Sequence, residues 1–324
     1  MLTKKILPLM ISVLALGDMV FAQQDMHFSL YRNHMTMFNP AIVGENGETF
    51  LNLSHKSQWH DIENAPETQV ISFGFPIANE RAGIGFNVIN DAVFVENKSS
   101  FFVNFSLKLP MSIKTNLFLG LQAGGSAYRI SGSDLKTLGL NGRLTDNLLV
   151  DHNQFNPNIG VGVYFKSSKY FISLSAPKIL STKNVIEKEG FYTTATERVH
   201  TYLSAGTNFS LSEDWTFTPY FLSRYVNYAP IFTSLNVALS KKEQVEFGVE
   251  YSLDTSMAGS FIIQLGGMHI GYAYSRSIHN EINKYNTGSH ELLFRVRLGN
   301  ARQNISFTDT EINNEYSRVS SINN

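Results

Sequence analysis

Apolar and polar residues alternate through most of the chain beyond residue 48. In the clearest segment, from residue 101 to 109, polar residues fill most positions between the apolar side chains Phe101, Val103, Phe105, Leu107 and Leu109. The same alternation runs through 117–126 and 244–253. Because successive side chains of a β-strand point to opposite faces, the pattern predicts strands with one apolar face and one polar or glycine-rich face.

Segments of this kind, about ten residues long, recur along the chain. The predicted strands are 48–59, 69–75, 82–90, 99–109, 116–129, 155–165, 170–175, 199–211, 215–225, 232–239, 244–253, 258–265, 268–277 and 290–298. This number is even, and a tilted strand needs this length to cross a bilayer. We therefore predict an all-β fold, a transmembrane outer-membrane β-barrel of about 14 antiparallel strands.

The lengths of the connections support a barrel independently. If the first strand runs outward, the periplasmic turns are 76–81, 110–115, 166–169, 212–214, 240–243 and 266–267, and none exceeds six residues. The other set contains every longer connection, including 130–154 and 176–198. Outer-membrane barrels sort their loops in this way. The alternative is a water-soluble β-sandwich or barrel with its apolar faces inside, but long strands with polar opposite faces would leave a wide sheet surface unfilled.

The two ends of the chain do not follow the alternation. Lys4 and Lys5 precede an apolar run at 6–16, and the small residue Ala22 follows, which predicts a signal peptide over 1–22. An uncleaved membrane anchor is disfavoured because the run is too short to cross a bilayer. Residues 23–47 are rich in Met and aromatic side chains, so we expect this segment to pack in the lumen or at the periplasmic mouth of a barrel over 48–298. Residues 299–324 are expected to form a flexible periplasmic tail.

Composition excludes several classes of protein. Charged residues make up 16% and aromatic residues 12% of the chain, a poor match to a water-facing surface. No apolar stretch of 18 residues lies beyond the N-terminus, which excludes a bundle of transmembrane helices. The net charge of −1 gives no basic field for nucleic acid, and the absence of Cys excludes disulfides and thiolate metal sites.

Candidate catalytic and metal-binding groups are weak. Ser289, His290 and Glu291 supply the residue types of a hydrolase, but adjacent strand residues point to alternate faces and cannot form a nucleophile–base pair. His27 and His34 lack the further ligands of a metal site. We therefore predict no enzymatic activity, no catalytic or metal site and no cofactor.

Other strand residues suggest how the barrel is filled and bounded. The strand charges fall on the polar faces, where we expect ion pairs that hold the N-terminal segment; ion selectivity in an open pore is the alternative. These charges are Lys56, Lys108, Glu246, Glu250, Arg295 and Arg297.

Strand glycines mark bends or sites of close approach by another segment. The glycines of this kind are Gly83, Gly85, Gly124 and Gly125. Aromatic residues expected in the interfacial girdles are Trp59, Phe75, Tyr164, Tyr170, Trp215 and Tyr220.

Four blocks of the chain form a distinctive set of motifs. The first is an aromatic-rich stretch that leads into Asn-Pro-Ala, and the last opens the final strand. The residues of these blocks are Phe28, Tyr31, Asn39, Pro40, Ala41 and Gly44, then Gln58, Trp59, Ala65, Pro66 and Thr68, then Gly83, Gly85, Asn90 and Asp91, and finally Gly288, Ser289, His290, Glu291 and Leu292. Together they resemble the PorP/SprF family of type IX secretion outer-membrane proteins of Bacteroidetes.

This resemblance implies a non-enzymatic component of the type IX secretion and gliding machinery in the outer membrane. Its expected partners are other components of that machinery, outer-membrane lipid and a large cell-surface adhesin that is exported or anchored through a C-terminal secretion domain. The outward loops 130–154 and 176–198 are the candidate partner-binding segments. The alternative functions are a porin-like passive channel for small solutes and, permitted by the fold alone, an outer-membrane lipid hydrolase.

Overall fold

The computed structural model describes residues 26–59, 62, 64–131, 152–181, 183–188, 191–196, 198–242, 244–278 and 287–298. The predicted signal peptide and C-terminal tail lie outside these residues. Three short helical turns come first, η1 (Tyr31–Asn33), α2 (Met35–Phe38) and η2 (Pro40–Ile42). The strands are β1 (Thr49–Gln58), β2 (Glu67–Ile77), β3 (Ala82–Val93), β4 (Glu96–Ser112), β5 (Thr115–Ile130), β6 (His152–Ser167), β7 (Tyr170–Ala176), β8 (Lys183–Lys188), β9 (Phe191–Thr196), β10 (His200–Thr207), β11 (Phe209–Ser210), β12 (Trp215–Val226), β13 (Phe232–Lys241), β14 (Val245–Ser252), β15 (Ser256–Leu265), β16 (Met268–Ser277) and β17 (Ser289–Leu298).

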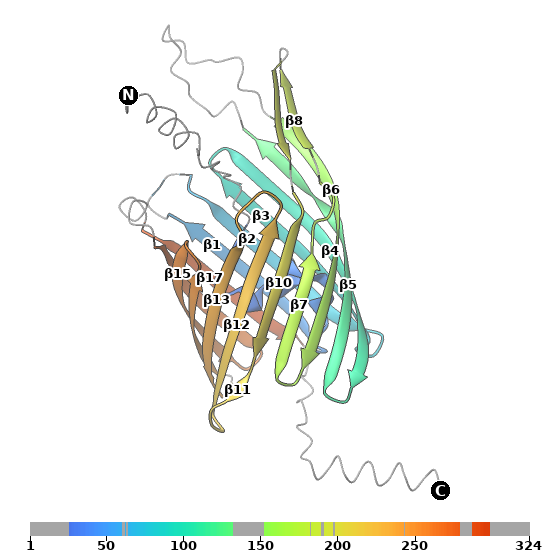
Figure 1. The fold of residues 1–324 in the computed structure, drawn as a ribbon, viewed down its shortest axis with the longest axis vertical. Coiled ribbons are helices and arrows are strands. Elements are labelled where there is room, and N and C mark those ends of the chain that lie inside the picture. The colour runs from blue at the N-terminus through green and yellow to red at the C-terminus, as the bar shows by residue number, and fades with distance from the viewer. Residues whose placement is uncertain are drawn as a thin grey trace, which may run out of the picture.

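The strands close into a barrel by antiparallel pairing of sequence neighbours (Figure 1). β1 pairs with β17, and β10 pairs with both β7 and β12, so the sheet has no free end at these strands. The short β11 continues β10 and also pairs with β12. Counted over the described residues, fourteen wall strands form the barrel, while β8 and β9 form a separate two-stranded sheet. The fold class predicted from alternation is confirmed.

All fourteen predicted strands are present, but two connections differ from the prediction. The predicted loop 91–98 is a tight turn, because β3 and β4 extend and pair Asp91 with Lys98. The predicted loop 176–198 contains the β8–β9 hairpin. Where strands project beyond the bilayer, both of their faces meet water, so the alternation that marks a strand disappears. Of the other candidate loop, 130–154, residues 132–151 lie outside the described part of the chain.

The side-chain distribution is the reverse of that in a water-soluble protein. Large apolar residues point outward in mid-strand, as with Leu121 on β5 and Val249 on β14, which are 61% and 54% exposed. Polar residues such as Asn52, Ser72 and Gln122 are buried on the inward face. An apolar outer band suits acyl chains, and a polar lumen is typical of outer-membrane barrels. Across the described residues, no helix has the length and apolar character needed to cross a membrane.

Residues 26–47, which we call the plug, lie inside the ring of strands (Figure 1). Phe28, Tyr31 and Phe38 of the plug are at most 5% exposed and form the centre of the main apolar cluster. The barrel wall contributes buried residues such as Phe118 and Tyr202 to the same cluster. The apolar core of the protein therefore lies between the plug and the wall, as the composition of the N-terminal segment predicted.

Two of the predicted girdle aromatics belong to the lumen instead. Tyr164 is buried and packs on Phe118, and the ring of Tyr220 lies 5.5 Å from the guanidinium carbon of Arg32 in the plug. Both residues occupy inward phases of their strands, where they pack against the plug. Trp59 and Tyr170 are 37% and 44% exposed, as a girdle position requires.

Arginine substitutions on β14 test the lipid-facing band. Replacing Val249 with Arg in the middle of this strand is expected to lower the free energy of unfolding by about 2–4 kcal/mol, because the charge would face hydrocarbon. Leu253 has the same phase but lies just beyond the strand, so Leu253→Arg is expected to cost about 0–1 kcal/mol. Denaturant unfolding in lipid vesicles measures both values. Equal losses at the two positions would contradict this placement of the bilayer.

Candidate functional site: the plugged lumen

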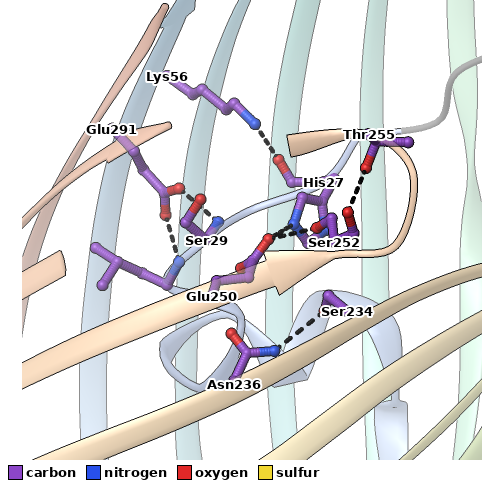
Figure 2. Close-up of polar contacts among 10 residues, drawn as sticks. His27, Ser29, Lys56, Ser234, Asn236, Glu250, Ser252, Thr255 and Glu291 are labelled. Carbon is purple, nitrogen blue, oxygen red and sulfur yellow. Dashed lines mark hydrogen bonds and ion pairs between the residues drawn. The ribbon is translucent and has the colours of Figure 1, made fainter. Parts of the chain in front are cut away.

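The start of the plug is held by charged side chains of β1 and β14. The His27 imidazole Nε2 lies 2.5 Å from Oε1 of Glu250 on β14, and Lys56 on β1 donates to the backbone carbonyl of His27 (Figure 2). Ser252 donates a further hydrogen bond of 2.7 Å to the same Glu250 oxygen. Glu250 is 3% exposed, so its charge depends on these partners.

Glu291 of β17 anchors the next residues of the plug through their backbone. Its Oε2 accepts from Ser29 N at 2.8 Å and its Oε1 from Leu30 N at 3.3 Å (Figure 2). His34 Nε2 lies 3.3 Å from Oε1 of Glu291, while His34 Nδ1 accepts from Asn52 Nδ2 at 3.3 Å. Since one imidazole nitrogen accepts, the contacts select the tautomer with its proton on Nε2.

Ion pairs also hold the plug towards the barrel end that carries the short turns. Arg32 pairs with Glu246 of β14, and Glu45 pairs with Lys166 of β6 at 3.1 Å. The expectation that lumen ion pairs hold the N-terminal segment is therefore confirmed for Glu246 and Glu250, whereas Lys56 holds this segment through a hydrogen bond to the backbone carbonyl of His27. Lys108 lies near the periplasmic end of β4, where its backbone N–H donates to Arg81 O.

The opposite side of the lumen binds the plug mainly through neutral side chains. Asn87 and Asn104 donate to the carbonyl of Thr36 at 3.0 and 3.1 Å. Ser175 donates to the carbonyl of Phe38 at 2.7 Å, and Ser106 donates to that of Val43. The plug has little secondary structure of its own, so the wall supplies partners for carbonyls that its short turns leave unpaired.

Asn39 links the plug to two strands, β6 and β7. Its side-chain Nδ2 donates to Ser173 Oγ at 2.8 Å and to Val163 O at 3.0 Å, and its Oδ1 accepts from Ala41 N at 2.9 Å. The last bond caps η2, which begins with Pro40. Because Pro fixes the backbone of the first turn and lacks an N–H, the Asn-Pro-Ala sequence forms a compact bend. This bend packs against the inner face of the wall.

Wall glycines allow that bend to approach closely. A Cβ at Gly120 of β5 would overlap the backbone nitrogen of Ala41, and one at the neighbouring Gly162 of β6 would overlap Oδ1 of Asn39. A Cβ at Gly85 would lie 2.8 Å from a methyl of Val43, and one at Gly83 would overlap the Val43 carbonyl. Gly124 and Gly125 differ, because they meet residues of neighbouring strands instead. Close approach by the plug thus explains the first four glycines.

The family-motif residues fall into three places. Phe28, Tyr31, Asn39, Pro40, Ala41 and Glu291 meet in the lumen. Gln58, Trp59, Pro66 and Gly288 meet at the loop ends of β1, β2 and β17, where Gln58 N donates to Pro66 O and Trp59 N to Gly288 O, both at 2.9 Å. Asn90, Asp91 and His290 are separate from both, with Asp91 accepting from Thr68 at 2.7 Å and His290 Nδ1 bonding Tyr272 Oη at 2.8 Å.

Sequence reasoning missed several plug-binding residues. His27 and Arg32 contact residues of β14 that lie more than 200 positions away in the sequence, and His34 contacts Ser54 of β1. No local sequence pattern predicts these pairs. Gly120 and Gly162 carried a usable signal, because each occupies an inward position in an alternating strand. Neighbouring side chains of the Ser289–Glu291 trio diverge as predicted: His290 contacts exposed Tyr272, whereas Glu291 is buried in the lumen.

The fold and its filled lumen define a plugged transmembrane β-barrel of the outer-membrane kind. The chain belongs to the family described as "Type IX secretion system membrane protein PorP/SprF", which matches residues 20–296. It is therefore an outer-membrane component of the type IX secretion class, and neither this family nor this fold is an enzyme class. No curated protein sequence matches the chain.

Solved structures of similar shape are other barrels with low sequence identity. Omp33 of Acinetobacter baumannii has a TM-score of 0.45 and 7% identity, covering 78% of this chain and all of that one. The CymD monoaromatic hydrocarbon channel has a TM-score of 0.48 and 12% identity, covering 83% and 94%. The KdgM porin has a TM-score of 0.36 and 7% identity, covering 77% and 99%.

A methyl group at Gly120 is expected to loosen the plug. Gly120→Ala overpacks the Ala41 contact, and an overpacking cost of about 1–3 kcal/mol corresponds to about 5- to 150-fold more plug release. Trypsin cleavage after Arg32, followed by mass spectrometry of the folded barrel, measures the release. Gly259→Ala is the matched control, since a Cβ there meets nothing within 4 Å. Equal cleavage rates in the two variants would contradict the proposed role of Gly120.

Proposed function

We propose that the protein supports the export or surface anchoring of a large adhesin, which it engages through the adhesin's C-terminal secretion domain. The family assignment supports a role in the secretion machinery. The filled lumen is the observation that supports an anchor rather than an open channel. A segment whose first turns are held by Glu250, Glu291 and Glu246 suits an anchor that keeps the membrane sealed. Type IX components and outer-membrane lipid are the remaining proposed partners.

The family-motif residues are proposed to maintain this plugged state rather than to perform chemistry. Phe28 and Tyr31 anchor the plug in the apolar core, and Asn39 fixes its bend against β6 and β7. Glu291 holds its first turn. In the described part of the chain, no group of three His, Asp or Glu side chains is arranged to hold a metal ion.

Affinity purification from native outer membranes tests the anchoring function. The tagged barrel is expected to bring down a secreted protein with a C-terminal secretion domain in stoichiometric amount. Deleting the gene for the barrel is expected to remove that protein from the cell surface. An adhesin that stays on the surface of the deletion strain, or a barrel that purifies with lipid alone, would contradict the proposal.

Planar-bilayer conductance separates the anchor from a passive channel. The intact protein is expected to pass little current, because the plug occupies the centre of the lumen, whereas deletion of 26–46 is expected to give a large, constant conductance. Heat-modifiable migration on a denaturing gel establishes that the deleted barrel has folded, and Gly259→Ala serves as the plugged control. A large steady current through the intact protein would favour the porin-like channel.

A further inference from the structure

A groove with a volume of about 690 Å³ crosses the lipid-facing side of the barrel wall. It extends over β7, β10, β12, β13 and β14, which pair with one another in that order and of which the first four are labelled in Figure 1. All five strands belong to the described part of the chain. The outward-facing residues of the groove are almost all apolar, and Ile172, Ala205, Pro219 and Leu235 are examples.

Small side chains on β10 form the floor of the groove. Ala205 pairs with Ile172 of β7 on one side and with Phe221 of β12 on the other, so a methyl group lies between two large outward side chains. The next outward residue of β10 is Thr207, which pairs with Tyr170. The wall is therefore hollowed along β10, because its outward side chains are shorter than those of both neighbouring strands.

Large rings of the same strands lie on the inner side of the wall. Gly206 faces inward between Phe171 and Tyr220, and a Cβ there would lie 2.6 Å from the Phe171 ring and 2.7 Å from Tyr220 Cβ. Both rings pack against the apolar cluster around the plug. The bulk of this part of the wall thus fills the space around the plug, and the outer face keeps the groove.

The groove lies mainly in the periplasmic half of the hydrocarbon layer. β12 and β14 begin at short periplasmic turns, and Pro219 and Val249 are the fifth residues of these strands. Four residue steps along a strand tilted by about 40° rise about 10 Å along the barrel axis, which is less than half of the roughly 30 Å hydrocarbon core. The surroundings of the groove are therefore acyl chains.

The length and rims of the groove suit one acyl chain. Five strands at about 4.8 Å spacing make it about 19 Å long, and a chain that crosses one leaflet obliquely covers a depth of about 15 Å. Association between membrane proteins needs close approach of their backbones. Ile172 and Phe221 stand on both sides of Ala205 and keep a second backbone away from the floor, whereas an unbranched hydrocarbon chain fits between them.

We propose that this groove binds one acyl chain of a phospholipid of the periplasmic leaflet. Tyr170, the first residue of β7, lies at the interface and would be near the headgroup end, while the methyl end would lie towards Tyr251 of β14. A chain in the groove contacts the wall on the floor and both rims, whereas a chain on a flat wall contacts it on one side only. The site involves no secretion partner, so it is tested independently of the proposed function.

Photolabelling with a lipid tests the site in the full-length barrel. The protein is reconstituted in vesicles of phosphatidylethanolamine and phosphatidylglycerol that contain a small share of phosphatidylethanolamine with a diazirine in its acyl chain. Peptide mass spectrometry after illumination is expected to find adducts enriched on Ile172 and Leu235, relative to outward residues of β5 such as Leu121.

A larger side chain on the floor is expected to displace the lipid. Ala205→Leu removes about ten carbon–carbon contacts of the bound chain, so adducts on Ile172 and Leu235 are expected to fall about fivefold. Ala123→Leu is the matched control, because it makes the same change at an exposed position of β5, where it is expected to leave these adducts unchanged. Heat-modifiable migration verifies that both variants are folded.

Two results of the photolabelling would overturn the proposal. Adducts spread evenly over the outward residues of the wall would identify the lipid in the groove as ordinary boundary lipid. Equal labelling of the wild type and Ala205→Leu would show that the chain does not lie on the floor of the groove.

Photocrosslinking in native outer membranes provides a second arm that needs no reconstitution. A photoreactive phenylalanine in place of Leu235 is expected to form adducts with phospholipid. Adducts with a second barrel or with another protein, in place of phospholipid, would mean that the groove is a protein interface and would overturn the lipid site.

Discussion

The structure depends on hydrogen bonds between inward-facing wall side chains and the backbone of the plug. A segment with only three short turns cannot pair its own carbonyls, and a buried unpaired carbonyl is costly. Asn87 and Asn104 both bond Thr36 O, Ser175 bonds Phe38 O, and Glu291 accepts from Ser29 N and Leu30 N. The wall side chains and the plug backbone therefore satisfy each other's hydrogen-bonding groups. Neither surface would have these groups paired without the other.

The two sides of the lumen hold the plug by different means. Charged residues of β1, β14 and β17 bind its first turns, where removing one partner would leave a buried charge. Against β5 and β6, glycines allow direct backbone contact with Asn39–Ala41. Buried charges thus restrain the first turns of the plug, whereas close packing and the Glu45–Lys166 ion pair restrain its later part.

The barrel could be predicted from the sequence because lipid imposes alternation on every residue that it touches. All fourteen wall strands were recognised for this reason, whereas the extensions near Asp91–Lys98 and the β8–β9 hairpin were missed. Outside the hydrocarbon, both faces of a strand meet water and the alternation is lost. The plug's presence followed from its apolar composition, but its contacts did not, since His27 and Glu250 lie 223 positions apart. Tyr164 and Tyr220 were assigned to the girdles because aromatic residues suit either environment, and only their phase shows that they face the plug.

The end of β7 and the bend of the plug are structurally adjacent. Asn39 bonds Val163 O on β6 and Ser173 on β7, close to where β7 ends, and Pro177 then packs over Gly160. The last pair of β7 with β6, Ala176 with Val161, therefore lies between the bend of the plug and the turn at Pro177. One strand positions both segments, because Gly162 of β6 leaves room for Asn39 and Gly160 leaves room for Pro177.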